Sequence, residues 1–170
     1  PFQPQPQDDI RFPGGAGPRH MAFSADGRFL CVVTEMSAQI HVFQIANDQL
    51  QAVQVIGLSD SDSPQENAGA GILFSPDGRF LYAGNRQQHN EIVVFSIDPQ
   101  SGRLSDRRQF SSGGVEPRAF AFDNSGNFLL AANVWSNTIV VFSRDPENGE
   151  LHPAGKSLHI GTPTDIKFLR

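Results

Sequence analysis

Hydrophobic residues and turn-forming residues follow one another along the chain in a pattern that repeats. Three segments align: PRHMAFSADGRFLCVVTE (18–35), AGAGILFSPDGRFLYAGNR (68–86) and PRAFAFDNSGNFLLAANV (117–134). Each is followed by a short apolar segment rich in β-branched residues, at 39–45, 91–97 and 138–144. One phenylalanine recurs as Phe23, Phe74, Phe122 and Phe168, with separations of 51, 48 and 46 residues. The chain therefore contains three repeat units and the opening of a fourth.

Each unit predicts four β-strands. The first two flank SADG, SPDG or NSG, which favour a tight turn. The β-branched segment gives the third, and a more polar fourth follows at 50–58, 104–110 and 151–160. Four antiparallel strands in about 40–50 residues are typical of a propeller blade, so the predicted fold class is all-β, a β-propeller. A β-sandwich or jelly roll is the alternative, but neither requires self-similar units at a fixed spacing.

The unit boundaries predict an incomplete ring. We expect residues 1–14 to form a linker or inter-blade loop, blades at 15–66, 67–113 and 114–161, and the start of a further blade at 162–170. A propeller closes with about 4–8 blades, so about three and a half would leave apolar faces open at both ends. The chain also begins at Pro1 rather than at a methionine. We therefore expect a fragment whose ring is closed by missing N-terminal blades or by a second copy.

The composition of the chain excludes several classes of partner and of metal site. The chain has 13 Lys and Arg against 18 Asp and Glu, a net charge of −5, which argues against a general nucleic-acid binder. No apolar run approaches the ~20 residues that span a bilayer, so we expect no membrane partner. The single cysteine excludes a disulfide framework within the chain and a cysteine-rich zinc site. No HExxH or EF-hand motif is present, and we predict neither a metal nor a cofactor.

Positions that differ between the units point to a site. Counted from the turn glycine of each unit, Arg19 and Arg118 lie eight residues before it, and Glu35 and Arg86 lie eight residues after it. Residues equidistant from a hairpin turn lie opposite one another, so we expect Arg19 to face Glu35. With His20, these residues gather at one end of the innermost strands, beside the central channel. Three arginines there predict a small anionic substrate, because guanidinium groups bind carboxylate or phosphate. The alternative is an ion pair that only holds the hairpin end.

Several motifs resemble the lactonase family of seven-bladed β-propellers. They are GAGPRHMAF (15–23), followed by Glu35, LYAGNR (81–86), PRAFAFDNSGNFLLAAN (117–133) and GTPTDIKF (161–168). The resemblance implies the C-terminal half of a seven-bladed ring that hydrolyses 6-phospho-D-glucono-1,5-lactone, a phosphorylated sugar lactone, in the pentose phosphate pathway. That pathway implies a cytoplasmic location, with the periplasm as the alternative.

A fungal branch of the same family cycloisomerises carboxymuconate-type diacids. Its functional set is a histidine from an earlier blade, an arginine and a glutamate sixteen residues apart, and a further arginine. Arg19 and Glu35 match the pair, and Arg86 is the best match for the further arginine. The earlier histidine has no counterpart in this chain. A third reading is a non-catalytic propeller that serves as an interaction module.

For lactone hydrolysis, each candidate residue receives a role. Glu35 is the expected general base, and Arg19 holds it ionised or stabilises the oxyanion. Arg86 and Arg118 are expected to bind the substrate phosphate or carboxylate. His20 is expected to donate a proton or to hydrogen-bond the substrate. We therefore predict Arg19, Glu35 and His20 as catalytic residues and Arg86 and Arg118 as substrate-binding residues.

Overall fold

The computed structural model describes residues 9–169 except 48, 62 and 64. The regular structure in these residues is β-strand, in three antiparallel four-stranded sheets. The strands are β1 (Pro18–Phe23), β2 (Phe29–Thr34), β3 (Gln39–Ala46), β4 (Gln49–Gly57), β5 (Gly69–Phe74), β6 (Phe80–Asn85), β7 (Glu91–Ile97), β8 (Leu104–Ser111), β9 (Pro117–Phe122), β10 (Phe128–Asn133), β11 (Thr138–Arg144) and β12 (Leu151–His159). We call the sheets blade 1 (β1–β4), blade 2 (β5–β8) and blade 3 (β9–β12). The predicted all-β class is confirmed.

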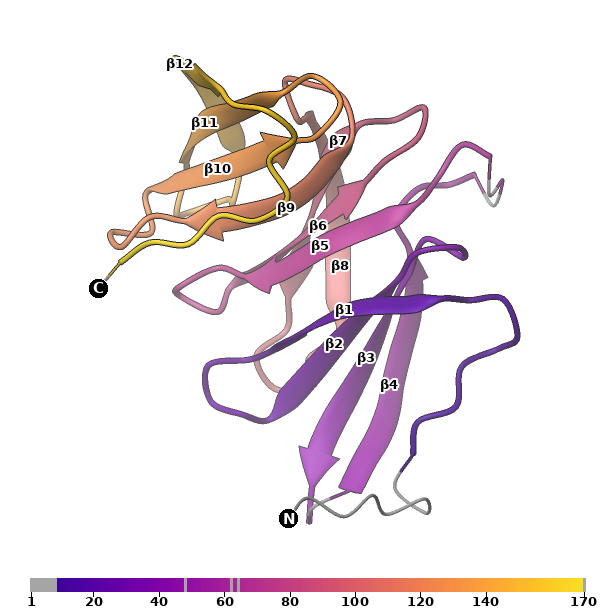
Figure 1. Cartoon of the computed structure of the whole chain (residues 1–170). Helices are drawn as coiled ribbons and strands as arrows, with labels where there is room; N and C mark the ends of the chain where they lie inside the picture. Colours follow the sequence, from indigo (N-terminus) through magenta and orange to yellow (C-terminus); the bar gives the residue numbers. More distant parts are fainter. Residues whose placement is uncertain (1–8, 48, 62, 64, 170) are drawn as a thin grey trace, which may run out of the picture.

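The blades follow one another as an arc with their first strands innermost. β1 contacts β5, and β5 contacts β9. Figure 1 shows blades 1 and 3 spreading away from these strands to β4 and β12, and β8 is the corresponding edge strand of blade 2, at the back of the view. The second strands β2 and β6 are buried throughout, whereas most of β12 is exposed, as expected for the polar outer strand. Within the described residues, no helix is long and apolar enough to cross a membrane.

The two larger clusters of the hydrophobic core are the interfaces between blades. The first joins blades 1 and 2 and includes Val33, Ile40, Leu81, Val93 and Phe95. The second joins blades 2 and 3 and includes Tyr82, Ile92, Phe120, Leu129 and Phe142. Burial of each such side chain contributes about 1.5–3 kcal/mol relative to exposure. The β-branched and aromatic residues of the repeat therefore hold neighbouring blades together as well as forming strands.

A repeated contact joins neighbouring blades at the rim that carries the tight turns. We call it the blade clamp: a phenylalanine at the start of a second strand packs against a glycine in the outer turn of the next blade. Phe29 contacts Gly102 in this way, and Phe80 contacts Gly149. Both glycines have positive φ, at 70° and 76°. The clamp therefore needs glycine both for the backbone conformation and for the space that the ring occupies.

The described residues at the two ends of the chain lie outside the twelve strands. Residues 1–8 of the predicted linker lie outside the described residues, whereas Ile10 and Phe12 pack against the outer face of blade 1. Residues 163–169 contain no strand, although the repeat predicts the opening strand of a further blade there. An innermost strand forms its ladder with the second strand of its own blade, and the described residues supply no such partner. Figure 1 shows this segment passing beside β9.

Candidate functional site

A β-bulge lies at the start of the first strand in each blade. In blade 1, Pro18 pairs with Thr34 but His20 pairs with Val33, so Arg19 is an extra residue in the ladder. Similar shifts occur at the start of β5 and of β9. Proline cannot donate a ladder hydrogen bond and is tolerated at a strand start or a bulge, which suits Pro18. A bulge redirects the side chain that it carries, and here that side chain belongs to Arg19.

Arg19 and Glu35 meet, but not as the direct cross-strand pair that we predicted. The predicted register, with Arg19 directly opposite Glu35, is wrong because the bulge adds one residue to β1 and because Glu35 lies just beyond the end of β2. The backbone N–H of Glu35 donates to the Gly17 carbonyl at 2.7 Å, which fixes its position. Arg19 Nε then lies 3.5 Å from Glu35 Oε2. The arginine side chain is 11% exposed and the glutamate side chain 39%, so the carboxylate is reachable from solvent.

Arg86 connects all three blades. It follows β6 in blade 2, and its side chain is 6% exposed. Its Nη2 donates to Glu35 Oε1 of blade 1 and, at 3.3 Å, to the Gly69 carbonyl. Its Nη1 donates to Glu116 Oε1, in the segment that leads into blade 3. One ion-pair network therefore contains the predicted residues Arg19, Glu35 and Arg86, and Glu116 belongs to it as well. We call these four residues the rim network.

Glu116 is the member of the rim network that the sequence analysis missed. It immediately precedes Pro-Arg in blade 3, where blade 1 has Gly17 before Pro-Arg. Both residues have left-handed backbone conformations, with φ of 65° at Glu116 and 66° at Gly17. A non-glycine residue in this conformation is uncommon and often marks a functional position. The replacement of glycine by glutamate between two aligned units was the signal available in the sequence.

His20 and Arg118 lie beside the rim network rather than in its contacts. His20 lines a pocket of about 460 Å³ between the inner strands and the C-terminal segment, which Asp165 and Lys167 also line. Arg118 is half-buried. Among the described residues, Arg118 has no carboxylate within ion-pair distance. Three arginines and two glutamates leave this rim with a formal charge of +1.

The sequence matches the family described as "Lactonase, 7-bladed beta-propeller" over residues 3–168. This chain belongs to the lactonase family. The 6-phosphogluconolactonase of Bacillus subtilis is 34% identical over 160 residues, which cover 93% of this chain and 46% of that protein. The 6-phosphogluconolactonase of Formosa agariphila is 37% identical over 134 residues, which cover 78% of this chain and 38% of that protein. This lactonase-family chain thus spans less than half the length of these relatives.

Solved structures agree with this family membership. The periplasmic gluconolactonase of Pseudomonas aeruginosa is 40% identical with a TM-score of 0.87, covering 95% of this chain and 45% of that one. A protein of Bacteroides fragilis, described as a putative 6-phosphogluconolactonase, is 29% identical with a TM-score of 0.86. That match covers 95% of this chain and 44% of the other. The chain is therefore a partial propeller relative to its lactonase relatives, as the repeat arithmetic predicted.

The charges of the rim network keep its exposed carboxylate ionised. Burial alone would raise the pKa of Glu35, but the hydrogen bond and charge of Arg86, followed by the charge of Arg19, outweigh it and lower the pKa. Desolvation, followed by the charges of Arg19 and Arg118, lowers the pKa of His20. At neutral pH this chain therefore presents an ionised Glu35 and a neutral His20. In the described residues, no three His, Cys, Asp or Glu side chains come together as a metal site.

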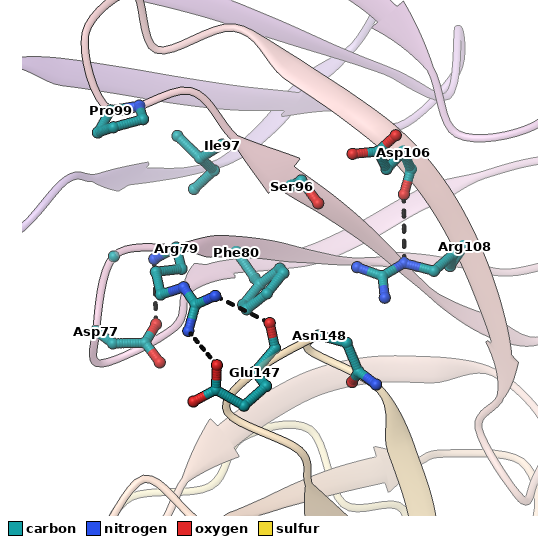
Figure 2. Close-up of a pocket in the computed structure, with 11 residues that line it drawn as sticks. Asp77, Arg79, Phe80, Ser96, Ile97, Pro99, Asp106, Arg108, Glu147 and Asn148 are labelled. Carbon is teal, nitrogen blue, oxygen red and sulfur yellow. Dashed lines mark hydrogen bonds and ion pairs between the residues drawn. The ribbon is translucent and has the colours of Figure 1, made fainter.

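The other rim carries a pocket of about 580 Å³ between blades 2 and 3 (Figure 2). Figure 2 shows that Arg79 is already engaged there, because its guanidinium donates to the Glu147 carbonyl at 2.9 Å and pairs with the Glu147 carboxylate. A smaller pocket of about 270 Å³ lies at the same rim between blades 1 and 2, lined in part by Arg28 and Phe29. Each pocket lies beside a blade clamp, at the rim opposite the rim network. The rim network is the candidate site of this lactonase-family chain.

Proposed function

We propose that this chain carries part of the active site of a lactonase that hydrolyses a sugar lactone. The observation that carries the proposal is the contact of the ionised, partly exposed Glu35 with the guanidinium groups of Arg19 and Arg86. Relatives named 6-phosphogluconolactonase support 6-phosphogluconolactone as the substrate and the pentose phosphate pathway as the setting.

Glu35 serves as the general base in this proposal. It accepts a proton from a water molecule whose oxygen attacks the carbonyl carbon of the lactone, a role that typically contributes ~10²–10⁴ in rate. The ring C–O bond of the ester then breaks, and the proton passes to the leaving alkoxide. One water is consumed, and the product is the open hydroxy acid. Arg19 stabilises the oxyanion of the tetrahedral intermediate, and His20 hydrogen-bonds the substrate or returns the proton.

Arg118 and Arg86 remain the candidates for the anionic group of the substrate. Both terminal nitrogens of Arg86 donate to carboxylates of the rim network, whereas its buried Nε has no hydrogen-bond partner among the described residues. Arg118 is half-buried beside the inner strands, and we propose that it makes the first contact with the phosphate. A substrate with one negative charge would need fewer free hydrogen-bond donors than a phosphate dianion.

A carboxymuconate-type cycloisomerase is the second candidate. The direct contact of Arg86 with Glu35, in a chain where Arg19 and Glu35 are sixteen residues apart, fits the functional set of that family branch. A non-catalytic interaction module is the third. For any of these activities, we propose that further N-terminal blades or a second copy complete the ring. A cytoplasmic location follows from the proposed pathway, and the periplasm is the alternative.

Turnover assays distinguish these candidates. The purified protein is incubated with 6-phosphogluconolactone, gluconolactone or a carboxymuconate, and acid release or ultraviolet absorbance is followed. We expect hydrolysis of the lactones and a loss of ~10²–10⁴ in kcat/KM on Glu35→Gln. Glu147→Gln, an exposed acid on the opposite rim, is the matched control. Turnover of the diacid alone would favour the cycloisomerase, and equal lactonase rates in Glu35→Gln and the parent would refute the assigned base.

A further inference from the structure

Glu116 occupies a position that is costly for a glutamate. Its φ of 65° lies in the left-handed region, where the equivalent residue of blade 1 is Gly17. Its side chain is 7% exposed, so the carboxylate has lost most of its hydration. A buried carboxylate is tolerated when a cation and hydrogen bonds compensate it. Both the backbone conformation and the burial indicate that a particular contact keeps a glutamate here.

The backbone of Glu116 is anchored independently of its side chain. Its N–H donates to Asn90 Oδ1 at 2.7 Å, and its carbonyl accepts the N–H of Val134 at 3.0 Å. The carboxylate can therefore act as a fixed acceptor. That acceptor binds Nη1 of Arg86.

Arg86 transmits this constraint to the reactive carboxylate. A guanidinium is planar, so an acceptor on Nη1 fixes the direction in which Nη2 points. Nη2 binds Oε1 of Glu35, whereas Oε2 of the same carboxylate lies 3.5 Å from Arg19 Nε. With Oε1 held by Arg86, Oε2 is the oxygen left to accept a proton. The chain of contacts thus runs from blade 3 through blade 2 to blade 1.

We propose that Glu116 is a positioning residue that holds Arg86 so that Arg86 orients the Glu35 carboxylate for proton abstraction. This inference rests on the proposed function, in which Glu35 is the general base. Glu116 itself touches neither substrate nor water in the reaction. Its effect should therefore appear in kcat and in the titration of Glu35, with KM little changed.

Two substitutions separate positioning from charge. Glu116→Gln keeps an oxygen acceptor for Arg86 but removes a negative charge, whereas Glu116→Gly removes both and adopts the residue that blade 1 uses in the same conformation. The groups that face Glu35 are Arg86, Arg19 and Arg118, with Glu116 behind Arg86. Because glycine accepts positive φ without strain, Glu116→Gly should fold, which circular dichroism checks.

The positioning role predicts different kcat values and different Glu35 titrations for the two variants. Glu116→Gln should retain kcat within about threefold, whereas Glu116→Gly should lose ~10–100-fold, as supporting residues around active sites typically do. The Glu35 carboxyl, followed by ¹³C NMR without substrate, should titrate at a lower pH in Glu116→Gln, because one negative charge is gone. In Glu116→Gly it should titrate at a higher pH than in Glu116→Gln, because Arg86 is no longer held against Oε1.

The outcomes separate this inference from the proposed function. Equal kcat values and equal Glu35 titrations in the two variants would overturn the positioning role. If the titrations differ as expected but no lactone is hydrolysed, the positioning stands as a feature of the rim network and the proposed function fails. If lactone hydrolysis depends on Glu35 but not on the residue at 116, the proposed function stands and the positioning role fails. Glu147→Gln again serves as the control for the loss of an acid elsewhere.

Discussion

Substitution of Gly149 by alanine should weaken the clamp between blades 2 and 3. Gly149 has φ of 76°, and a Cβ at this position would lie 2.7 Å from two atoms of the Phe80 ring. Neither side can move easily. The Tyr82 hydroxyl donates to the Gly149 carbonyl at 2.8 Å, and Phe80 is 4% exposed.

The expected loss has two parts that a control can separate. Alanine in the left-handed conformation costs about 1–2 kcal/mol relative to glycine. Forcing a methyl group into packed surroundings adds about 1–3 kcal/mol. Gly155 has φ of 65° with nothing within 4 Å of a Cβ, so Gly155→Ala carries only the first part. The difference between the two variants should therefore be about 1–3 kcal/mol.

Urea unfolding followed by circular dichroism measures this difference. With a slope of about 2 kcal/mol per M, the midpoint of Gly149→Ala should fall about 0.5–1.5 M below that of Gly155→Ala at an unchanged slope. In Gly149→Ala combined with Phe80→Ala, the clash is relieved, so the two substitutions should cost less than their sum. Equal midpoints for Gly149→Ala and Gly155→Ala would refute the packing part of the reasoning.

Three further predictions concern buried charge, pH and fluorescence. Arg86→Met leaves the Glu116 carboxylate buried without its cation, so it should lower the free energy of unfolding, measured in urea, by about 3–5 kcal/mol. Adding Glu116→Gln should restore most of that free energy, because the uncompensated charge is gone. No recovery in the double variant would contradict this account. Burial alone would raise the pKa of Asp77, but hydrogen bonds from Arg144, Ser75 and the Arg79 backbone, together with the charge of Arg144, outweigh it and lower the pKa. The ionised Asp77 therefore stabilises the fold fully above the unfolded pKa of about 3.9, and this stabilisation is lost as the pH falls through the lower folded pKa. Asp77→Asn should flatten the acid side of a plot of urea midpoint against pH. An unchanged slope on the acid side would contradict this prediction. Trp135 is the chain's single tryptophan and is 66% exposed, so its emission should shift little on unfolding, and a strongly blue-shifted native spectrum would show that it is covered.

The repeat made most of the architecture predictable. Strand periodicity and turn residues are local properties, so the tight turns and the β-branched third strands could be located from residue order alone. The repeat also predicts the opening of a further blade at 162–170, but residues 163–169 form no strand, because a strand needs a partner that supplies its ladder. The contact of Arg19 with Glu35 was predicted, but from a strand register that the structure shows to be wrong. Their contact depends on a bulge that counting from the turn does not reveal.

The candidate site shows the same division. The sequence alone determined that the chain is built of propeller blades and that arginine and glutamate gather at the rim opposite the tight turns, because both follow from the comparison of units. Only the tertiary structure decided which groups pair. Arg86 binds Glu35, 51 residues away, and Glu116, 30 residues away, across two blade boundaries. Such a contact depends on how neighbouring blades pack and on which backbone conformation a buried residue is made to adopt, and neither is encoded within one repeat.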